Sequence, residues 1–198
     1  MEREHGATLV DVLATLTLIG IVAAIGIPNL ETARRRAGLD TLARTIISNA
    51  QLCRMHAINA KRNAGLVFSR DRGRWSFIPA LDGDGDGVSR KDVLRGTDPR
   101  IAPPVYLDAL CAGAQIGVPE QWRVPDPAGR GRLRAGDGLA AGRSDIISFS
   151  ALGDATPASV YLGDGRERLL VLRIYGGTAR VRVLEWRTGW TRWRQISL

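Results

Sequence analysis

Four acidic residues in the middle of the sequence have a spacing that suits a hard cation. They are Asp82, Asp84, Asp86 and Asp92. The first three alternate with glycines, as positions 1, 3 and 5 of a calcium-binding loop do, and Gly87 stands at position 6. The last acid comes one residue before the closing position, and Arg90 and Lys91 add positive charge beside it. A calcium site and a solvated acidic turn are therefore both open interpretations.

The carboxyl-terminal stretch interleaves arginine with tryptophan. Its arginines are Arg180, Arg182, Arg187, Arg192 and Arg194. Guanidinium groups pair with phosphates, and the rings of Trp186, Trp190 and Trp193 are of the kind that stacks on nucleic-acid bases. DNA contact is one interpretation. In the other, the segment forms sheet edge strands whose tryptophans pack on the core beneath arginine side chains, with cation–π contacts.

Cysteine and histidine give little support to catalysis or metal binding. Cys53 and Cys111 have neither a CxxC nor a zinc spacing. Two interpretations are open: a disulfide, which an exported domain allows, and two buried thiols. His56 lies in a predicted helix without an HExxH or catalytic-triad context, and the sequence contains neither a P-loop nor a nucleophile elbow. The sequence therefore favours a non-enzymatic protein, with no cofactor beyond the calcium considered above.

The domain with these residues is expected to follow a long helix that begins near the amino terminus. The stretch Gly6–Asp11 runs directly into an apolar segment, so that residues 7–29 provide roughly 20 residues, enough to cross a ~30 Å hydrocarbon core. A secretory signal peptide would require a small-residue cleavage site after this segment, and none follows it. A carboxylate such as Asp11 costs on the order of 2.5–3.5 kcal/mol inside a membrane, so it indicates a partner or a function.

The residues around Asp11 resemble the start of the type IV pilin family, which includes the pseudopilins of type II secretion. In that family a leader ending in glycine precedes a cleaved and methylated residue, then Thr-Leu, an apolar residue and an acid. The stretch Gly6–Asp11 has this register, with Ala7 where Phe or Met is customary and Asp11 where Glu is. Pro28 matches the position of the family's helix kink.

The resemblance implies how the chain is processed and where it lies. It implies a leader over residues 1–6, cut between Gly6 and Ala7 by prepilin peptidase, with methylation of the new amine of Ala7. It implies that Asp11 pairs with the amino terminus of a neighbouring subunit during assembly. It also implies a single-pass inner-membrane protein whose carboxyl-terminal domain lies in the periplasm and whose partners are other pilin or pseudopilin subunits.

Beyond the apolar segment, residues 30–64 are expected to continue the helix in amphipathic form. Apolar residues recur there at steps of three and four, as on one face of a helix. They are Leu39, Leu42, Ile46, Ala50, Cys53, Ala57 and Ala60. Residues 65–198 contain short apolar segments separated by glycine turns, which indicate antiparallel strands and begin with a hairpin over 66–78. The expected fold is α+β: a long amino-terminal helix, transmembrane in its first half, packed on an antiparallel β-sheet domain.

Two parts of this domain are similar to H-type minor pseudopilins and FimT proteins. Residues 66–95 have a Trp/Phe strand followed by an Asp/Gly-rich turn, and residues 145–183 have a strand, a Gly-x-x-Thr-Pro turn and later an Arg-x-Arg. Some FimT-like minor pilins bind DNA through a GRxR motif. The nearest match is Gly177–Arg182, with two residues inserted before the first arginine.

The charge balance is compatible with two explanations. A net charge of +8 suits an anionic partner such as nucleic acid or lipid headgroups, but the excess of arginine over lysine is also what a GC-rich genome produces. The leading hypothesis is a minor pseudopilin or pilin subunit of a type II secretion pseudopilus or a type IV pilus, acting in protein secretion or pilus biogenesis. The alternative is a DNA-binding minor pilin for natural transformation.

Overall fold

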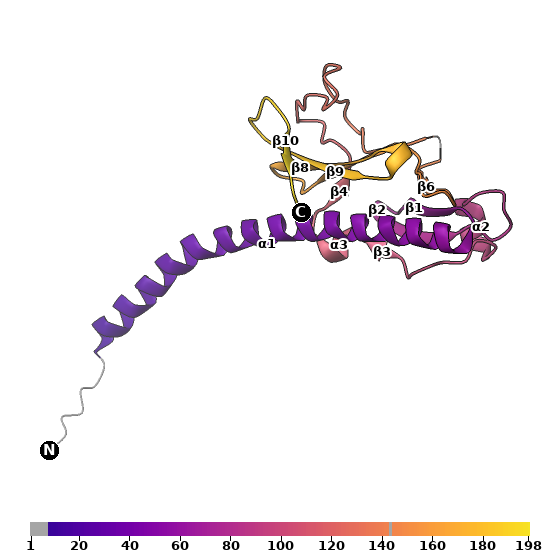
Figure 1. Ribbon diagram of the computed structural model, residues 1–198. Coiled ribbons are helices and arrows are strands. Elements are labelled where there is room, and N and C mark those ends of the chain that lie inside the picture. Colours follow the sequence, from indigo (N-terminus) through magenta and orange to yellow (C-terminus); the bar gives the residue numbers. More distant parts are fainter. Residues whose placement is uncertain (1–7, 143) are drawn as a thin grey trace. The chain divides into compact units, whose positions relative to one another are not determined.

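The computed structural model describes residues 8–142 and 144–198, except for the side chains of residues 25–29. The chain divides into two compact units, the first ending at Ala37 and the second covering Gly38–Leu198 (Figure 1). This boundary lies several residues after the expected one between residues 29 and 30. The coarse expectation of an α+β fold with an amino-terminal helix and antiparallel sheets is confirmed.

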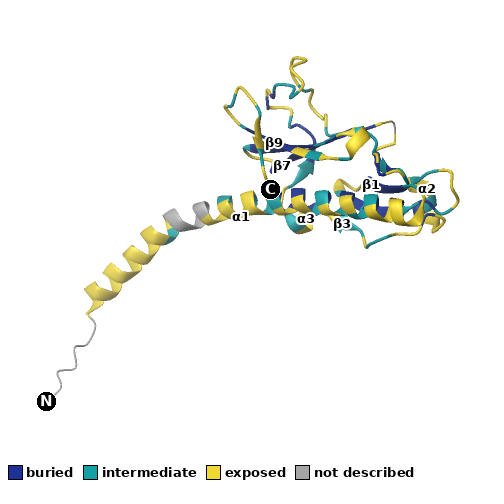
Figure 2. Ribbon diagram, viewed as in Figure 1, coloured by how far each residue is buried: buried dark blue, intermediate teal, exposed yellow. Residues whose placement is uncertain are grey.

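Helix α1, Leu9–Ala60, contributes to both units. Its part in the first unit exposes large apolar side chains all round the helix, and Figure 2 shows most of the described residues of this segment as exposed. Within the described part of the chain, no helical stretch combines the length and the apolar character needed to span a bilayer. The expected span also includes Ala7 and the side chains of residues 25–29, which lie outside the described residues. Pro28, the expected kink, is one of these five, and α1 continues through it.

In the second unit α1 is amphipathic, as its sequence predicts. Its buried face has the three- and four-residue spacing of a helix packed on one side. This face consists of Leu39, Leu42, Ala43, Ile46, Ala50, Cys53 and Ala57. The helix ends at Ala60, which is exposed rather than part of the buried stripe, and the chain reaches the first strand at Ala64.

The first sheet is built around the predicted hairpin. Strands β1 (Ala64–Asp71) and β2 (Arg74–Leu81) pair in antiparallel register from Ala64 opposite Leu81 to Asp71 opposite Arg74. Their two-residue turn, Arg72–Gly73, has positive φ at both positions, which matches the right-handed twist of the strands. Strands β3 (Val105–Tyr106) and β6 (Ile146–Phe149) complete the order β3-β2-β1-β6.

The second sheet contains the carboxyl-terminal strands in the order β10-β9-β8-β7-β4, with β5 also paired to β7. Its strands are β4 (Gln115–Ile116), β5 (Leu139–Ala141), β7 (Ala158–Gly163), β8 (Arg168–Ile174), β9 (Val181–Arg187) and β10 (Arg194–Ile196). All of these pairs are antiparallel. The short helices α2 (Arg90–Arg95) and α3 (Leu107–Leu110) and the 3-10 turn η1 (Gly176–Thr178) lie in the connections.

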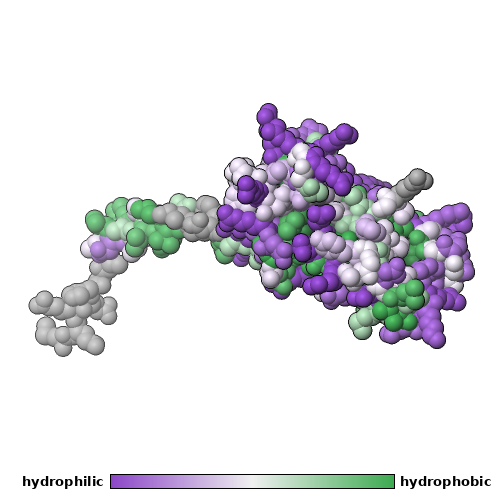
Figure 3. All heavy atoms as spheres, turned by 45° about the horizontal axis from the view of Figure 1, so that its top comes forward, coloured by the Kyte–Doolittle hydropathy of each residue, from purple (hydrophilic) through white to green (hydrophobic). Residues whose placement is uncertain are grey.

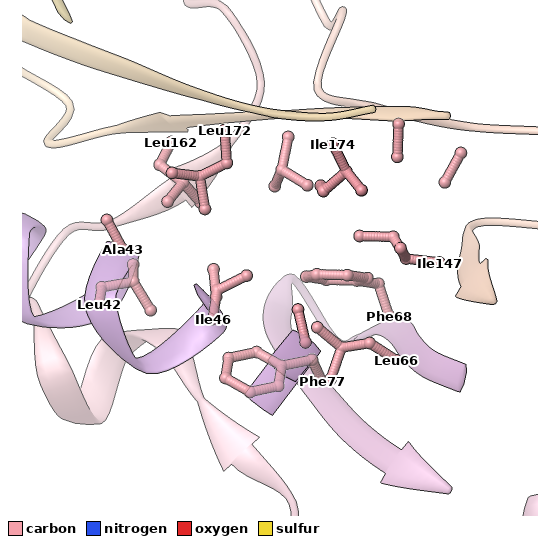
Figure 4. Packing of buried hydrophobic residues seen from close by; sticks show 14 of the residues in the cluster. Leu42, Ala43, Ile46, Leu66, Phe68, Phe77, Ile147, Leu162, Leu172 and Ile174 are labelled. Atoms are coloured by element: carbon pink, nitrogen blue, oxygen red, sulfur yellow. The ribbon is translucent and has the colours of Figure 1, made fainter. Parts of the chain in front are cut away.

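The main core lies where both sheets meet the second-unit part of α1. Figure 4 shows Leu42 and Ile46 of α1 beside Leu172 of the second sheet and Phe68 and Phe77 of the first. A second cluster lies on the other face of the second sheet and includes Trp122, Tyr161 and Trp186. Gly38 allows the close approach of α1 to α3, because a Cβ there would lie 3.0 Å from the carbonyl oxygen of Leu110.

Candidate functional site

Asp11, the carboxylate expected to serve assembly, closes the first turn of α1. The backbone N–H of Thr8 donates to its carboxylate over 3.0 Å, and the Thr8 hydroxyl donates to the same oxygen over 2.7 Å. The N–H of Asp11 donates to the Thr8 hydroxyl oxygen over 3.3 Å. This reciprocal arrangement is a capping box, which satisfies backbone donors that a helix end leaves open. The processing residues Gly6 and Ala7 lie outside the described residues.

The structure brings three of the four predicted calcium ligands together. One carboxylate oxygen from each of Asp82, Asp84 and Asp86 lies within 4.8 Å of the others. Asp84 raises the pKa of the exposed Asp86 through a side-chain hydrogen bond and its charge. Asp82 is buried and accepts hydrogen bonds from the backbone N–H groups of Gly85 (2.7 Å) and Gly87 (3.1 Å).

The fourth expected ligand, Asp92, has a different role. Ser89 is the N-cap of α2 and accepts from the N–H of Asp92 over 3.1 Å, while its hydroxyl donates to the Asp92 carboxylate. Asp92 is therefore part of a helix cap, and its assignment to the cation site is corrected. A carboxylate that the sequence interpretation missed, the fully buried Asp98, orders the loop by accepting from the N–H groups of Gly83 (3.0 Å) and Ser89 (2.9 Å).

Two tryptophans of the carboxyl-terminal stretch, Trp186 and Trp193, form packing contacts and hydrogen bonds within the folded domain. Trp186 is buried, packs on Trp122 with ring centroids 5.7 Å apart, and donates its indole N–H to the carbonyl oxygen of Trp190 over 2.8 Å. Trp193 donates its indole N–H to the carbonyl oxygen of Pro125 over 2.7 Å. Of the two interpretations open from the sequence, this geometry supports tryptophans packed on the core.

The five candidate DNA-contact arginines are not gathered in one place. The guanidinium groups of Arg187 and Arg194 lie 5.5 Å and 4.3 Å from the centroid of Trp190, and Arg187 also pairs with Glu185 over 2.8 Å. Arg192 is exposed. Arg180 and Arg182 both line one surface hollow.

This hollow, which we call the arginine groove, has a volume of about 730 Å³. It is lined by Ile47, Tyr175–Thr178, Arg180–Val183 and Gln195–Leu198, with no Asp or Glu side chain among these described residues. Arg182 lies over the ring of Tyr175, 5.6 Å from its centroid. In the strand register Arg182 stands opposite Arg173 of β8, so two like charges are neighbours on one face of the sheet.

A buried ionic network joins α1 to the second sheet. Arg168 of β8 pairs through Nη2 with Asp40 of α1 over 2.8 Å and through Nε with Glu185 of β9 over 2.6 Å. Arg168 and Glu185 are 5% and 6% exposed. Burial raises the pKa of Glu185, but hydrogen bonds from Arg187 and Arg168 lower it more, so the carboxylate remains charged.

The sequence interpretation missed this network, although two signals were present. Arg168 begins the apolar strand Leu169–Leu172, and Glu185 stands between Leu184 and Trp186. A charge inside an apolar strand of a folded protein usually has a buried partner. The sequence does not show which partner it is.

Cys53 and Cys111 are two buried thiols, and the disulfide interpretation is wrong. A Cβ at Gly38 would lie 3.2 Å from the Cβ of Cys111, whereas Cys53 stands 15 residues further along the same helix, roughly 22 Å away. A disulfide needs Cα atoms less than about 7 Å apart. Burial raises the pKa of the Cys53 thiol to about 12.

No known protein family, no curated protein and no solved structure matches this chain. The pilin resemblance of its first residues therefore stays a prediction. The other observations that bear on function are the contacts of Asp11, the arginine groove and the change of exposure along α1.

Proposed function

We propose that the chain is a non-enzymatic minor pseudopilin or pilin subunit of a type II secretion pseudopilus or a type IV pilus. The observation that carries this proposal is the change of character along α1. The helix exposes apolar side chains all round in the first unit and buries one face against two antiparallel sheets in the second. Such a helix suits a subunit that is held by one end of the helix and presents a folded domain at the other.

The exposed apolar side chains of the first unit need an environment other than water. Leu9, Leu16, Leu18, Ile19 and Val22 are each at least 60% exposed. Burial of one such side chain contributes roughly 1.5–3 kcal/mol, so their combined exposure to water is strongly unfavourable. We propose that residues 7–29 span the inner membrane before assembly and pack against neighbouring helices afterwards, with the second unit in the periplasm.

Asp11 has a place in both states under this proposal. In the single chain its carboxylate accepts from Thr8 within the capping box. A carboxylate has about four acceptor sites, so it accepts a further donor without losing these bonds. In the assembly that further donor is the amino terminus of a neighbouring subunit, exposed when prepilin peptidase cuts between Gly6 and Ala7.

The test separates processing from assembly. Gly6→Val in cells that contain the peptidase is expected to leave the full-length chain with slower electrophoretic mobility and no methylated Ala7 in its mass spectrum. Asp11→Asn is expected to be cut and methylated normally but to be missing from sheared filaments. Arg132→Gln is the control, because that side chain is exposed in the second unit, outside the helix that the proposal assigns to assembly. A Gly6→Val chain with the mobility of the wild type would overturn the processing proposal.

A second candidate function, a DNA-binding minor pilin, is favoured by the arginine groove alone. Arg180 and Arg182 line it, Arg173 lies opposite Arg182, and no Asp or Glu side chain is among the described lining residues. Electrophoretic shift of duplex DNA by the full chain in detergent tests this function. Arg180→Ala/Arg182→Ala is expected to abolish the shift, and the matched pair Arg187→Ala/Arg194→Ala to keep it. Equal binding by wild type and the groove variant would remove this candidate.

A further inference from the structure

Three consecutive arginines form a cationic ring on α1 just after its apolar part. Arg34, Arg35 and Arg36 all lie in the first unit. Successive residues of an α-helix are about 100° apart, so these three side chains cover about 200° of the circumference. Arg35 also pairs with Glu31 over 3.4 Å. We call the three residues the arginine collar.

The position of the collar along the helix matches the dimensions of a bilayer. From Leu9 to Leu30, two exposed large apolar residues, the helix rises about 32 Å, close to the ~30 Å of a hydrocarbon core. The collar follows Leu30 by four to six residues, a rise of about 6–9 Å. The headgroup layer on each side of the core is about 5–8 Å thick. The collar therefore reaches phosphate depth when the apolar part fills the core.

The surface of α1 changes from apolar to polar as the helix approaches the collar. Figure 3 shows a mainly hydrophobic surface along the first part of α1. Beyond Leu30 the helix carries Glu31 and Thr32 before the three arginines. Long arginine side chains at a membrane boundary extend toward the headgroups, and their planar guanidinium groups bind phosphate in a bidentate manner. A ring of such groups meets lipid on several sides of the helix, whereas a contact with another protein element uses one face.

We propose that the arginine collar binds the phosphates of anionic phospholipids where α1 leaves the bilayer. This inference rests on the membrane span of the proposed function and adds a lipid class and three residues to it. The collar fixes the depth of the helix in the membrane, and its lipids must be released when a subunit moves into a filament. Each arginine near an anionic surface strengthens association about fivefold, so exchanging all three has a large effect on lipid selection.

The experiment measures which lipids surround the full chain after reconstitution. The protein is incorporated into phosphatidylcholine vesicles that contain a trace of spin-labelled phosphatidylglycerol or spin-labelled phosphatidylcholine. The fraction of motionally restricted lipid gives the selectivity for the anionic headgroup. We expect wild type to prefer phosphatidylglycerol by at least about fivefold, the effect of a single arginine, with the preference falling in 1 M salt, where the Debye length is about 3 Å.

Two variants of equal charge decide the role of the collar. Arg34→Gln/Arg35→Gln/Arg36→Gln is expected to lose the preference for phosphatidylglycerol. Arg130→Gln/Arg132→Gln/Arg134→Gln removes three exposed arginines from a loop of the second unit and is expected to keep it. Arg34→Lys/Arg35→Lys/Arg36→Lys keeps the three charges but loses the bidentate guanidinium geometry, so it is expected to retain only part of the preference.

The outcomes separate this inference from the function on which it rests. A wild-type chain that fails to float with the vesicles contradicts the membrane span itself. A chain that floats but shows no headgroup preference, or a collar variant with undiminished preference, overturns the collar inference and leaves the span standing. Loss of preference in the loop variant as well as the collar variant also overturns it, because net charge would then be the cause.

Discussion

The two parts of helix α1 place their apolar side chains in opposite surroundings. Up to Ala37, leucine, isoleucine and valine side chains are exposed all round the helix. From Gly38 onward, apolar residues are confined to one face, and that face is buried in the core. The second part thus has its partner inside the chain. Under the proposed function, the first part finds its partners in the membrane and in neighbouring subunits.

Ionic interactions follow the same division. In the first part, Asp11 bonds to Thr8 and Glu31 pairs with Arg35, each within about one turn of the same helix. The carboxylate of the second part, Asp40, pairs with Arg168 of a distant strand. Substitutions in the second part should therefore change the stability of the folded second unit, and matched substitutions in the first should affect only the helix itself.

Arg168→Met is expected to have the largest effect. It leaves Asp40 and Glu185 without their shared cation, and the loss of one partner from a buried ion pair costs about 3–5 kcal/mol. The loss of stability is measured by urea unfolding of the full chain in detergent, with tryptophan fluorescence as the signal. Arg192→Met, at an exposed position, is the control and should change stability by less than about 0.5 kcal/mol. Equal stability of the two variants would show that the network contributes nothing.

Ile46→Ala and Ile21→Ala test the comparison directly. Ile46 is 1% exposed and Ile21 is 54% exposed on the same helix. The first substitution should destabilise the second unit by about 2–5 kcal/mol through lost burial and a cavity. The second should leave urea unfolding of that unit unchanged. If Ile21→Ala were equally destabilising, the first part of α1 would belong to the core after all.

Two glycines of α1 allow a second matched test. Gly38→Ala places a Cβ 3.0 Å from the carbonyl oxygen of Leu110 and 3.2 Å from the Cβ of Cys111. Such overpacking costs about 1–3 kcal/mol, more than the helix propensity gained. Gly20→Ala meets no atom within 4 Å and should raise helix stability by up to about 1 kcal/mol. Thermal unfolding by circular dichroism distinguishes the two signs, and a stabilising Gly38→Ala would contradict the tight contact with α3.

Thr8→Ala should affect only the start of the helix. The loss of an N-cap hydroxyl costs about 1 kcal/mol locally, so the amides of Leu9 to Val12 should exchange about five times faster. Hydrogen exchange with mass spectrometry measures this, and Thr8→Ser, which keeps the hydroxyl, should restore protection. Unchanged exchange in Thr8→Ala would mean that Asp11 alone closes the first turn.

The smallest effect is a pH dependence that arises in the buried ionic network of the second unit. The pKa of Glu185 lies below its ordinary value of 4.5, so its contribution to the free energy of unfolding is complete above that pH. It is lost as the pH falls through the lower folded pKa. Glu185→Gln should therefore flatten the loss of stability between about pH 5 and pH 3 relative to wild type, as measured by urea midpoints. If the urea midpoints of the variant depended on pH as those of wild type do, carboxylates other than Glu185 would be responsible for the loss of stability in acid.

The core face of α1 and the first hairpin could be predicted, because both depend on short-range geometry. Leu42 and Ile46 follow helical spacing, and Arg72–Gly73 adopts the turn that joins two adjacent strands. For Asp92 the sequence is compatible with two local roles. The acid could serve as a ligand in a calcium loop or bond to Ser89 at the start of a helix. The cap forms because it satisfies a backbone donor at the start of α2.

The sequence by itself determined the periodicities: an apolar segment behind the stretch Gly6–Asp11, one apolar face on the helix that follows, and strands between glycine turns. These are set by residues within a few positions of one another. Only the tertiary structure decided the partners. It separated Cys53 from Cys111, placed Arg187 and Arg194 at Trp190 but Arg180 and Arg182 at the arginine groove, and joined Asp40 to Arg168. The physical reason is that such contacts depend on how strands and helix pack, which local spacing does not encode.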